Sequence, residues 1–190
     1  MQSILGIIAV AIGFVGFAIY FRSIFKHNIK PHLFSWLIWG LSGGIVFVAQ
    51  FLEGAGPGAW AMGANAIMCL TVAGIAVQHG EKNITKTDWW SLFSALGALS
   101  LWHWTKDPLL SVIILGIVDL VGIIPTVRKT WINPWQESMT FFVVDLIKFP
   151  LSIMAMEVLN LTTIIYPLAI MIASFTCASV IIIRRKVLHT

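Results

Sequence analysis

Three charged residues stand deep within apolar runs of this 190-residue chain: Asp119, Asp145 and Lys148. A charge at the centre of a bilayer costs about 3 kcal/mol or more, so such residues normally face the interior of a helix bundle and have a partner or a function. Asp145 and Lys148 are three residues apart, which puts them on one helical face where they can pair. Adjacent helices would alternatively let Lys148 reach Asp119.

Two acids for one base leave one carboxylate without an evident cation. That carboxylate can bind a proton, a cation or a substrate amine. We therefore interpret Asp119, Asp145 and Lys148 as candidate residues for proton or ion coupling. The alternative is a buried polar cluster whose only task is to hold two helices together.

The elements that carry these residues are predicted membrane helices. The chain is 58% hydrophobic and 11% charged, whereas soluble domains contain about 25% charged residues. A bilayer span needs roughly 20 apolar residues. This measure predicts an all-α membrane protein with seven spans, near residues 4–21, 33–51, 57–77, 88–104, 109–127, 139–156 and 162–183. The segment 88–104 is short and contains three serines, so a helix on the membrane surface is its alternative interpretation.

The basic residues predict how these spans are oriented. With the N-terminus outside, the cytoplasmic loops and C-terminus hold ten of the 12 Lys and Arg residues. Cytoplasmic loops carry an excess of Lys and Arg, so we expect an external N-terminus and a cytoplasmic C-terminus. Removing one predicted span from the middle of the chain would move the later basic loops to the outside, so the distribution of Lys and Arg also supports seven spans. The net charge of +4 then reflects topology, and we expect no nucleic-acid partner.

The chain also contains an internal repeat. An offset of 106 residues places Arg22 on Arg128 and Trp39 on Asp145. Each half has the same plan of helix, basic loop, helix, short loop and helix, with one helix between the halves. Both halves then start outside and run parallel, related by an axis along the membrane normal. The predicted units are a first three-helix bundle, a linker helix and a second three-helix bundle, at 1–79, 80–106 and 107–190.

The segment 122–131, GIIPTVRKTW, resembles the Pro-Gln motif of the PQ-loop superfamily, with a Pro-Thr pair at 125–126. Relatives in this superfamily include SWEET sugar transporters, PnuC-type vitamin transporters and cystinosin. The resemblance implies a 3+1+3 helix arrangement and transport of a small solute by alternating access. It also implies gating at prolines within the spans, here Pro125 and Pro150, although the first repeat lacks the motif's proline. The acid Asp119 resembles the proton-coupling arrangement of cystinosin.

The same resemblance suggests residues that bind the solute. Asn65 offers a donor and an acceptor near the middle of its span, and SWEETs hold their solute with asparagines of the third and seventh helices. An offset of 110 brings Ser174 to within one residue of the position opposite Asn65. SWEETs also use an aromatic platform on the second helix, for which Trp36 and Trp39 are candidates, and the repeat puts Trp39 level with Asp145. The alternatives are a helix contact for Asn65 and packing or interfacial anchoring for the tryptophans.

The sequence carries no sign of an enzyme. Its five histidines have no metal-ligand spacing and no nucleophile has an evident base, so we expect no catalytic residue, metal or cofactor. Our interpretation is a transporter of a small polar solute, such as a sugar, amino acid or vitamin, in a lipid bilayer. Proton coupling through Asp119 and a homo-oligomer are left open. The alternative is a non-transporting receptor or membrane chaperone on the same fold.

Overall fold

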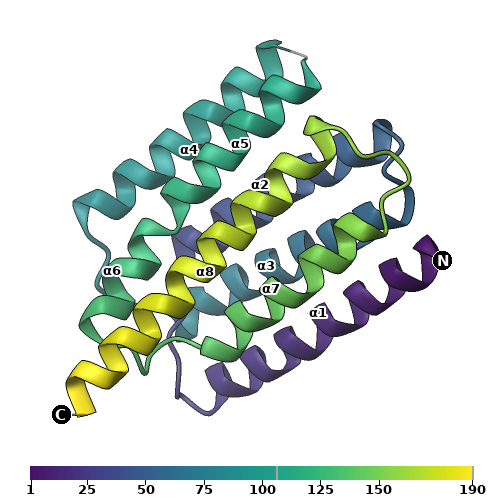
Figure 1. Cartoon of the computed structure of the whole chain (residues 1–190). Coiled ribbons are helices and arrows are strands. Elements are labelled where there is room, and N and C mark those ends of the chain that lie inside the picture. Colours follow the sequence, from purple (N-terminus) through teal and green to yellow (C-terminus); the bar gives the residue numbers. More distant parts are fainter. Residues whose placement is uncertain (106, 190) are drawn as a thin grey trace.

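The computed structural model describes residues 1–105 and 107–189, and this part of the chain is all-helical, without strands. The elements in chain order are α1 (Gln2–Phe25), α2 (Leu33–Leu52), the 3-10 turn η1 (Gly56–Ala59), α3 (Trp60–His79), α4 (Lys86–Thr105), α5 (Pro108–Gly122), α6 (Ile124–Ile132), α7 (Met139–Met154) and α8 (Leu161–His189) (Figure 1). The predicted all-α fold class is confirmed.

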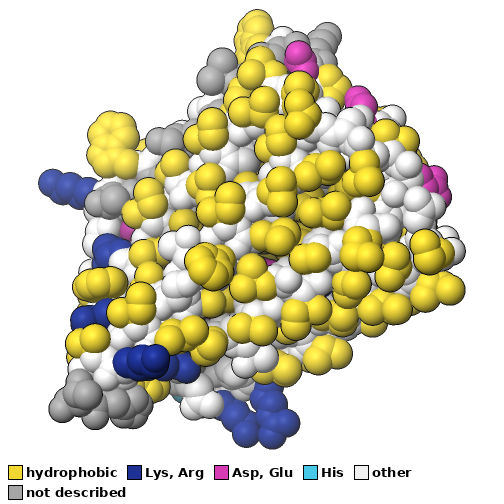
Figure 2. Space-filling model, viewed as in Figure 1, with side chains coloured by type: hydrophobic (Ala, Val, Ile, Leu, Met, Phe, Trp, Pro, Cys, Tyr) yellow, Lys and Arg dark blue, Asp and Glu magenta, His cyan; other side chains and the backbone are white. Residues whose placement is uncertain are grey.

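Five helical segments in the described part have the length and apolar composition of a membrane span: α1, α2, η1 with α3, α5 with α6, and most of α8. Many of their large apolar side chains are exposed, for example Ile7, Ile67, Ile117 and Phe175, and Figure 2 shows hydrophobic side chains covering the visible face. Such a surface is stable against lipid tails and unfavourable in water. These helices indicate an integral membrane protein.

The predicted span 109–127 is interrupted in the structure. Asp107 caps its start by accepting hydrogen bonds from the backbone nitrogens of Leu109 and Leu110, and α5 then ends at Gly122. Pro125 follows in the first turn of α6, where its missing N–H does least harm. Because Pro125 has no N–H, the ladder of backbone hydrogen bonds lacks one bond where α5 meets α6, although Ile123 between them keeps helical dihedral angles.

The helices close into a ring when their contacts are followed around the molecule. The order is α1, α3, α2, α5, α8, α7 and back to α1, and α4 packs outside the ring against α5 and α2. Helix α3 therefore lies between α1 and α2, and α8 lies between α5 and α7. Helix α1 contacts α7, and α5 contacts α2. At one of these contacts α1 and α7 approach closely, since a Cβ on Gly16 would lie 2.7 Å from Val144.

Lys and Arg side chains gather at one end of the helices, as Figure 2 shows. This is the end at which α1, α3 and α8 finish and α2, α4 and α7 begin, and we call it the basic end. In the described part of the chain Lys148, near the middle of α7, is the one Lys or Arg that lies away from it. The other end carries Glu53, Asp107 and Glu157, and we call it the opposite end.

Candidate functional site

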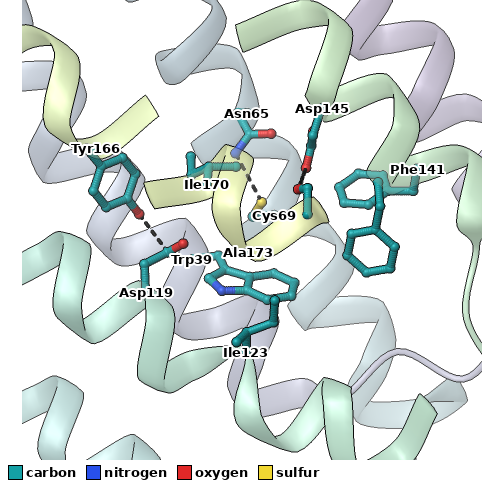
Figure 3. A pocket seen from close by; sticks show the side chains of 12 residues that line it. Trp39, Asn65, Cys69, Asp119, Ile123, Phe141, Asp145, Tyr166, Ile170 and Ala173 are labelled. Carbon is teal, nitrogen blue, oxygen red and sulfur yellow. Dashed lines mark hydrogen bonds between the residues drawn. The ribbon is translucent and has the colours of Figure 1, made fainter. Parts of the chain in front are cut away.

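A small cavity lies at the centre of the ring. Residues of α2, α3, α5, α7 and α8 line it together with Ile123; the polar and aromatic members are Trp39, Asn65, Cys69, Asp119, Phe141, Phe142, Asp145, Tyr166 and Ser174 (Figure 3). It offers about 20 Å³ to the centre of a water molecule, which is room for one or two waters. The cavity is therefore a small space with a mostly apolar lining into which a few polar groups project.

One wall of the cavity is a buried network around Asp145 and Lys148. The Lys148 Nζ lies 2.6 Å from Asp145 Oδ1 and donates a 2.7 Å hydrogen bond to Asn65 Oδ1. Ser174 Oγ donates to the other Asp145 oxygen at 3.0 Å. Both charged side chains are nearly fully buried, so each needs the other to offset the cost of leaving water. The network joins α3 to α7 and α8.

Lys148 does not reach Asp119. Its ammonium lies 5.2 Å from the ring centroid of Phe17 and 4.8 Å from that of Phe149, where the ring faces add a favourable cation–π contribution. Gly13 makes room beside it, since a Cβ there would lie 3.4 Å from Lys148 Cδ. Of the two pairings that the spacing left open, the structure has Asp145 with Lys148.

Asp119 occupies the facing part of the cavity wall. Tyr166 of α8 donates a 2.8 Å hydrogen bond to its Oδ1, and both side chains are buried. No pattern in the sequence indicated Tyr166, because it lies 47 positions away along the chain and meets Asp119 only through the packing of α5 on α8. Cys69, Phe141 and Phe142 are further lining residues that the sequence did not indicate.

The two candidate tryptophans differ in position. Trp39 lines the cavity, whereas Trp36 is buried below it with ring centroids 4.8 Å from Tyr20 and 5.0 Å from Phe141. Trp36 therefore belongs to an aromatic layer between the cavity and the basic end. Neither Pro125 nor Pro150 lines the cavity: Pro125 lies in the first turn of α6 and Pro150 inside α7.

Ion pairs close the basic end of the ring. Lys129 of α6 pairs with Glu137 of the α6–α7 loop, and both are buried. Lys129 also donates to the backbone oxygen of Lys30, and Tyr20 donates to Glu137 Oε2 at 3.1 Å. Arg185 of α8 donates to the Glu137 backbone oxygen at 3.2 Å. This cluster, which we call the basic-end latch, ties α1 and the α1–α2 loop to α6 and α8.

A second ionic contact lies beside the latch. Asp88, in the first turn of α4, accepts a 3.1 Å hydrogen bond from Arg128 of α6 and lies 3.3 Å from His32 Nε2, directly before α2. His32 and Asp88 are both fully buried. Burial lowers the pKa of His32 from its ordinary value; Asp88 opposes this shift, while Lys129 and Arg128 add to it. His32 is therefore held mostly neutral at pH 7.

Hydrogen bonds that are mostly between neutral groups close the opposite end. Gln50 of α2 donates a 2.7 Å bond to the backbone oxygen of Thr163 at the start of α8, and Ser152 of α7 donates one of 2.7 Å to the backbone oxygen of Gly58. Gly58 is also a point of close approach, because a Cβ there would lie 2.8 Å from the Met156 backbone nitrogen. The cavity is thus closed from both ends.

Comparisons with protein-family models, curated proteins and solved structures found no match to this chain. Across the described residues no group of three His, Cys, Asp or Glu side chains is placed to hold a metal ion. The chemistry of the site therefore rests on its own geometry: a buried ion pair with amide and hydroxyl partners, a separate Asp119–Tyr166 pair and an aromatic wall.

Proposed function

We propose that this protein is a membrane transporter for a small polar solute, which binds in the central cavity between two three-helix bundles. The observation that carries the proposal is the polar network of Asp145, Lys148 and Asn65, buried at the boundary of the two halves. Charged groups at membrane depth are costly, and they are typical of solute and ion pathways. The proposed solute site consists of Asn65, Trp39, Asp145 and Ser174. Trp36 packs against the Trp39 ring on the side of the basic end.

The two bundles, residues 1–79 and 107–190 with the linker 80–106, are supported by the packing order. Residues of α3 lie between α1 and α2, and α8 lies between α5 and α7; the contact of α1 with α7 repeats as that of α5 with α2. This repetition fits a parallel pseudo-twofold relation between the halves. It agrees with the 3+1+3 plan that the resemblance to the PQ-loop superfamily implies.

The same proposal includes seven spans with an external N-terminus. The segments α4 and α7 complete the count, and the basic end then lies in the cytoplasm. Its support is the basic residues at the ends of α1, α3, α6 and α8, which fit the positive-inside rule.

Transport in this proposal proceeds by alternating access. The cavity holds about one water-sized group, so the bundles must separate at one end to admit a solute and at the other to release it. The junction at Ile123 before Pro125, and Pro150 inside α7, are the proposed points of bending. Pro125 leaves the ladder one bond short between α5 and α6, and Pro150 removes a backbone hydrogen bond from α7. Proton coupling would use Asp119, whose carboxyl lies on the pathway.

The test is saturable uptake into liposomes that contain the purified protein, for a solute selected by a thermal-shift screen of sugars, amino acids and vitamins. Asn65→Leu should lower uptake per folded protein at least tenfold, because it removes the donor and the acceptor that the Asn65 side chain offers to the solute. The matched control is Thr71→Val, which changes an exposed polar side chain of the same helix that bonds only its own helix backbone. Binding of the solute without flux would reject transport and favour the alternative function, a receptor that does not transport.

A further inference from the structure

The two acids of the cavity are not equally satisfied. Asp145 has an ion pair with Lys148 at Oδ1 and accepts a hydrogen bond from Ser174 at Oδ2. Asp119 has one bonded oxygen, Oδ1, and no hydrogen bond from any described residue reaches its Oδ2. Asp119 is only 2% exposed, so this oxygen cannot obtain its hydrogen bonds from bulk solvent. Because Asp119 lines the cavity, this free acceptor is available to a donor that enters it.

The charge of the cavity wall is also unbalanced. The cavity wall carries the two acids Asp119 and Asp145. Lys148 is the one cation at this depth in the described chain, and it does not line the cavity. It lies behind Asn65, beside Gly13 and Phe17. Lys148 neutralises its direct partner Asp145, and Asp119 is left without an ion pair. A lone carboxylate at this depth requires a cation or a proton.

Trp39 adds an unused donor near the same carboxylate. Its Nε1 is buried and has no hydrogen-bond partner in the described structure. It lies against α5, since a Cβ on Gly122 would be 3.5 Å from it, and Gly122 is about one helical turn beyond Asp119. Figure 3 shows the indole beside Asp119 on the cavity wall. An acceptor, a donor and an aromatic ring thus meet on one side of the cavity.

We propose that the solute is a small organic cation: an ammonium compound that also carries an acceptor oxygen. The ammonium donates to Asp119 Oδ2 and neutralises the carboxylate, and the oxygen accepts from Trp39 Nε1. A neutral polyol would fill the same space yet bring no cation, so Asp119 would still depend on a proton. This inference rests on the proposed transport function and names its substrate class.

The experiment compares ligands that differ in one group. Ethanolamine and ethylene glycol have the same size and oxygen but differ in charge, while ethylamine keeps the ammonium and lacks the oxygen. Binding to the full-length protein in nanodiscs is measured by thermal shift at pH 7.5. We expect ethanolamine to half-saturate at a concentration at least tenfold lower than ethylene glycol, with ethylamine in between.

Two variants assign the preference to residues. Asp119→Asn should abolish the tenfold preference for the ammonium compound, whereas Glu157→Gln, an exposed acid at the opposite end, should retain it. Trp39→Phe keeps an aromatic ring without the N–H. It should weaken ethanolamine about fivefold and leave ethylamine unchanged, a result that stays informative even where Asp119→Asn folds poorly.

The protonation of Asp119 gives an independent readout. Infrared difference spectra should show a protonated-carboxyl band that decreases when ethanolamine is added and is absent from Asp119→Asn. Equal binding of the glycol and the amine, or no binding of either amine, would overturn the inference. Uptake of neutral solutes alone would reject it and leave transport standing, whereas amine binding without flux would support it and reject transport.

Discussion

The two ends of the molecule close the same cavity with different chemistry. At the basic end the closing contacts are charged: Lys129 pairs with Glu137, and Asp88 lies between Arg128 and His32. At the opposite end they are mostly neutral, as in the bonds of Gln50 to Thr163 and Ser152 to Gly58, and the backbone approaches closely at Gly58. The exception is Glu53, which accepts a 3.3 Å hydrogen bond from Asn160. The two ends are therefore expected to respond differently to the loss of one group.

The difference follows from the cost of desolvation. A buried ion pair gains little net energy over water, because both ions lose their hydration, yet removing one partner leaves the other buried and unpaired at about 3–5 kcal/mol. A neutral hydrogen bond contributes about 0.5–1.5 kcal/mol, and a lost partner costs about 1–3 kcal/mol. Single changes at the basic end should thus shift the protein further towards an open form than single changes at the opposite end.

The largest expected effect is that of Glu137→Gln. It removes the charge that pairs with Lys129 and weakens the acceptor for Tyr20, so the closed form should lose about 3–5 kcal/mol. The thermal midpoint in nanodiscs should fall by about 10 °C. The double variant Lys129→Met with Glu137→Gln leaves no unpaired charge and should recover most of this loss. A double variant no more stable than Glu137→Gln would contradict the ion-pair account of the basic-end latch.

Gln50→Leu should have an intermediate effect at the opposite end. The leucine is close in volume and leaves the Thr163 backbone oxygen without its donor, at a cost of about 1–3 kcal/mol. The loss should not depend on pH between about 5.5 and 8, since neither group titrates there. Denaturation followed at several pH values checks this. A loss as large as that of Glu137→Gln would remove the distinction between the two ends.

The smallest effect concerns the pH dependence of His32. Its pKa is lowered by burial, so below about pH 6.5 the unfolded chain binds more protons than the folded protein, and stability falls as the pH drops. The thermal midpoint should decrease between about pH 7 and 5.5, by about 2–4 °C for each kcal/mol lost. His32→Gln should flatten this slope, while His27→Asn at an exposed position should keep it. An unchanged slope in His32→Gln would exclude His32 as its source.

The sequence predicted the features that depend on local spacing. The five membrane-length segments follow from apolar runs, and the Asp145–Lys148 contact follows from a separation of three residues on one helix. The break at Ile123 was not predicted, although Pro125 was noted, because the apolar run continues through it and hides the interruption in the backbone.

Contacts between distant segments lay beyond the sequence. Tyr166 meets Asp119, and Glu137 meets Tyr20, only because non-neighbouring helices pack together. Lys129 and Arg128 were interpreted as loop charges that set topology, since positions near helix ends are usually solvated; Lys129 is instead buried and pairs with Glu137. A single sequence carries no signal for such pairs.

The most direct test of alternating access uses Cys69, which lines the cavity and is buried. With Cys177 replaced by Ser, Cys69 is the sole thiol, and a membrane-impermeant thiol reagent reports access from each side of oriented vesicles. We predict labelling of Glu137→Gln from the side of the basic end and of Gln50→Leu from the other side, both faster than the parent. Labelling of both variants from the same side, or of neither, would contradict closure of the cavity by two separate gates.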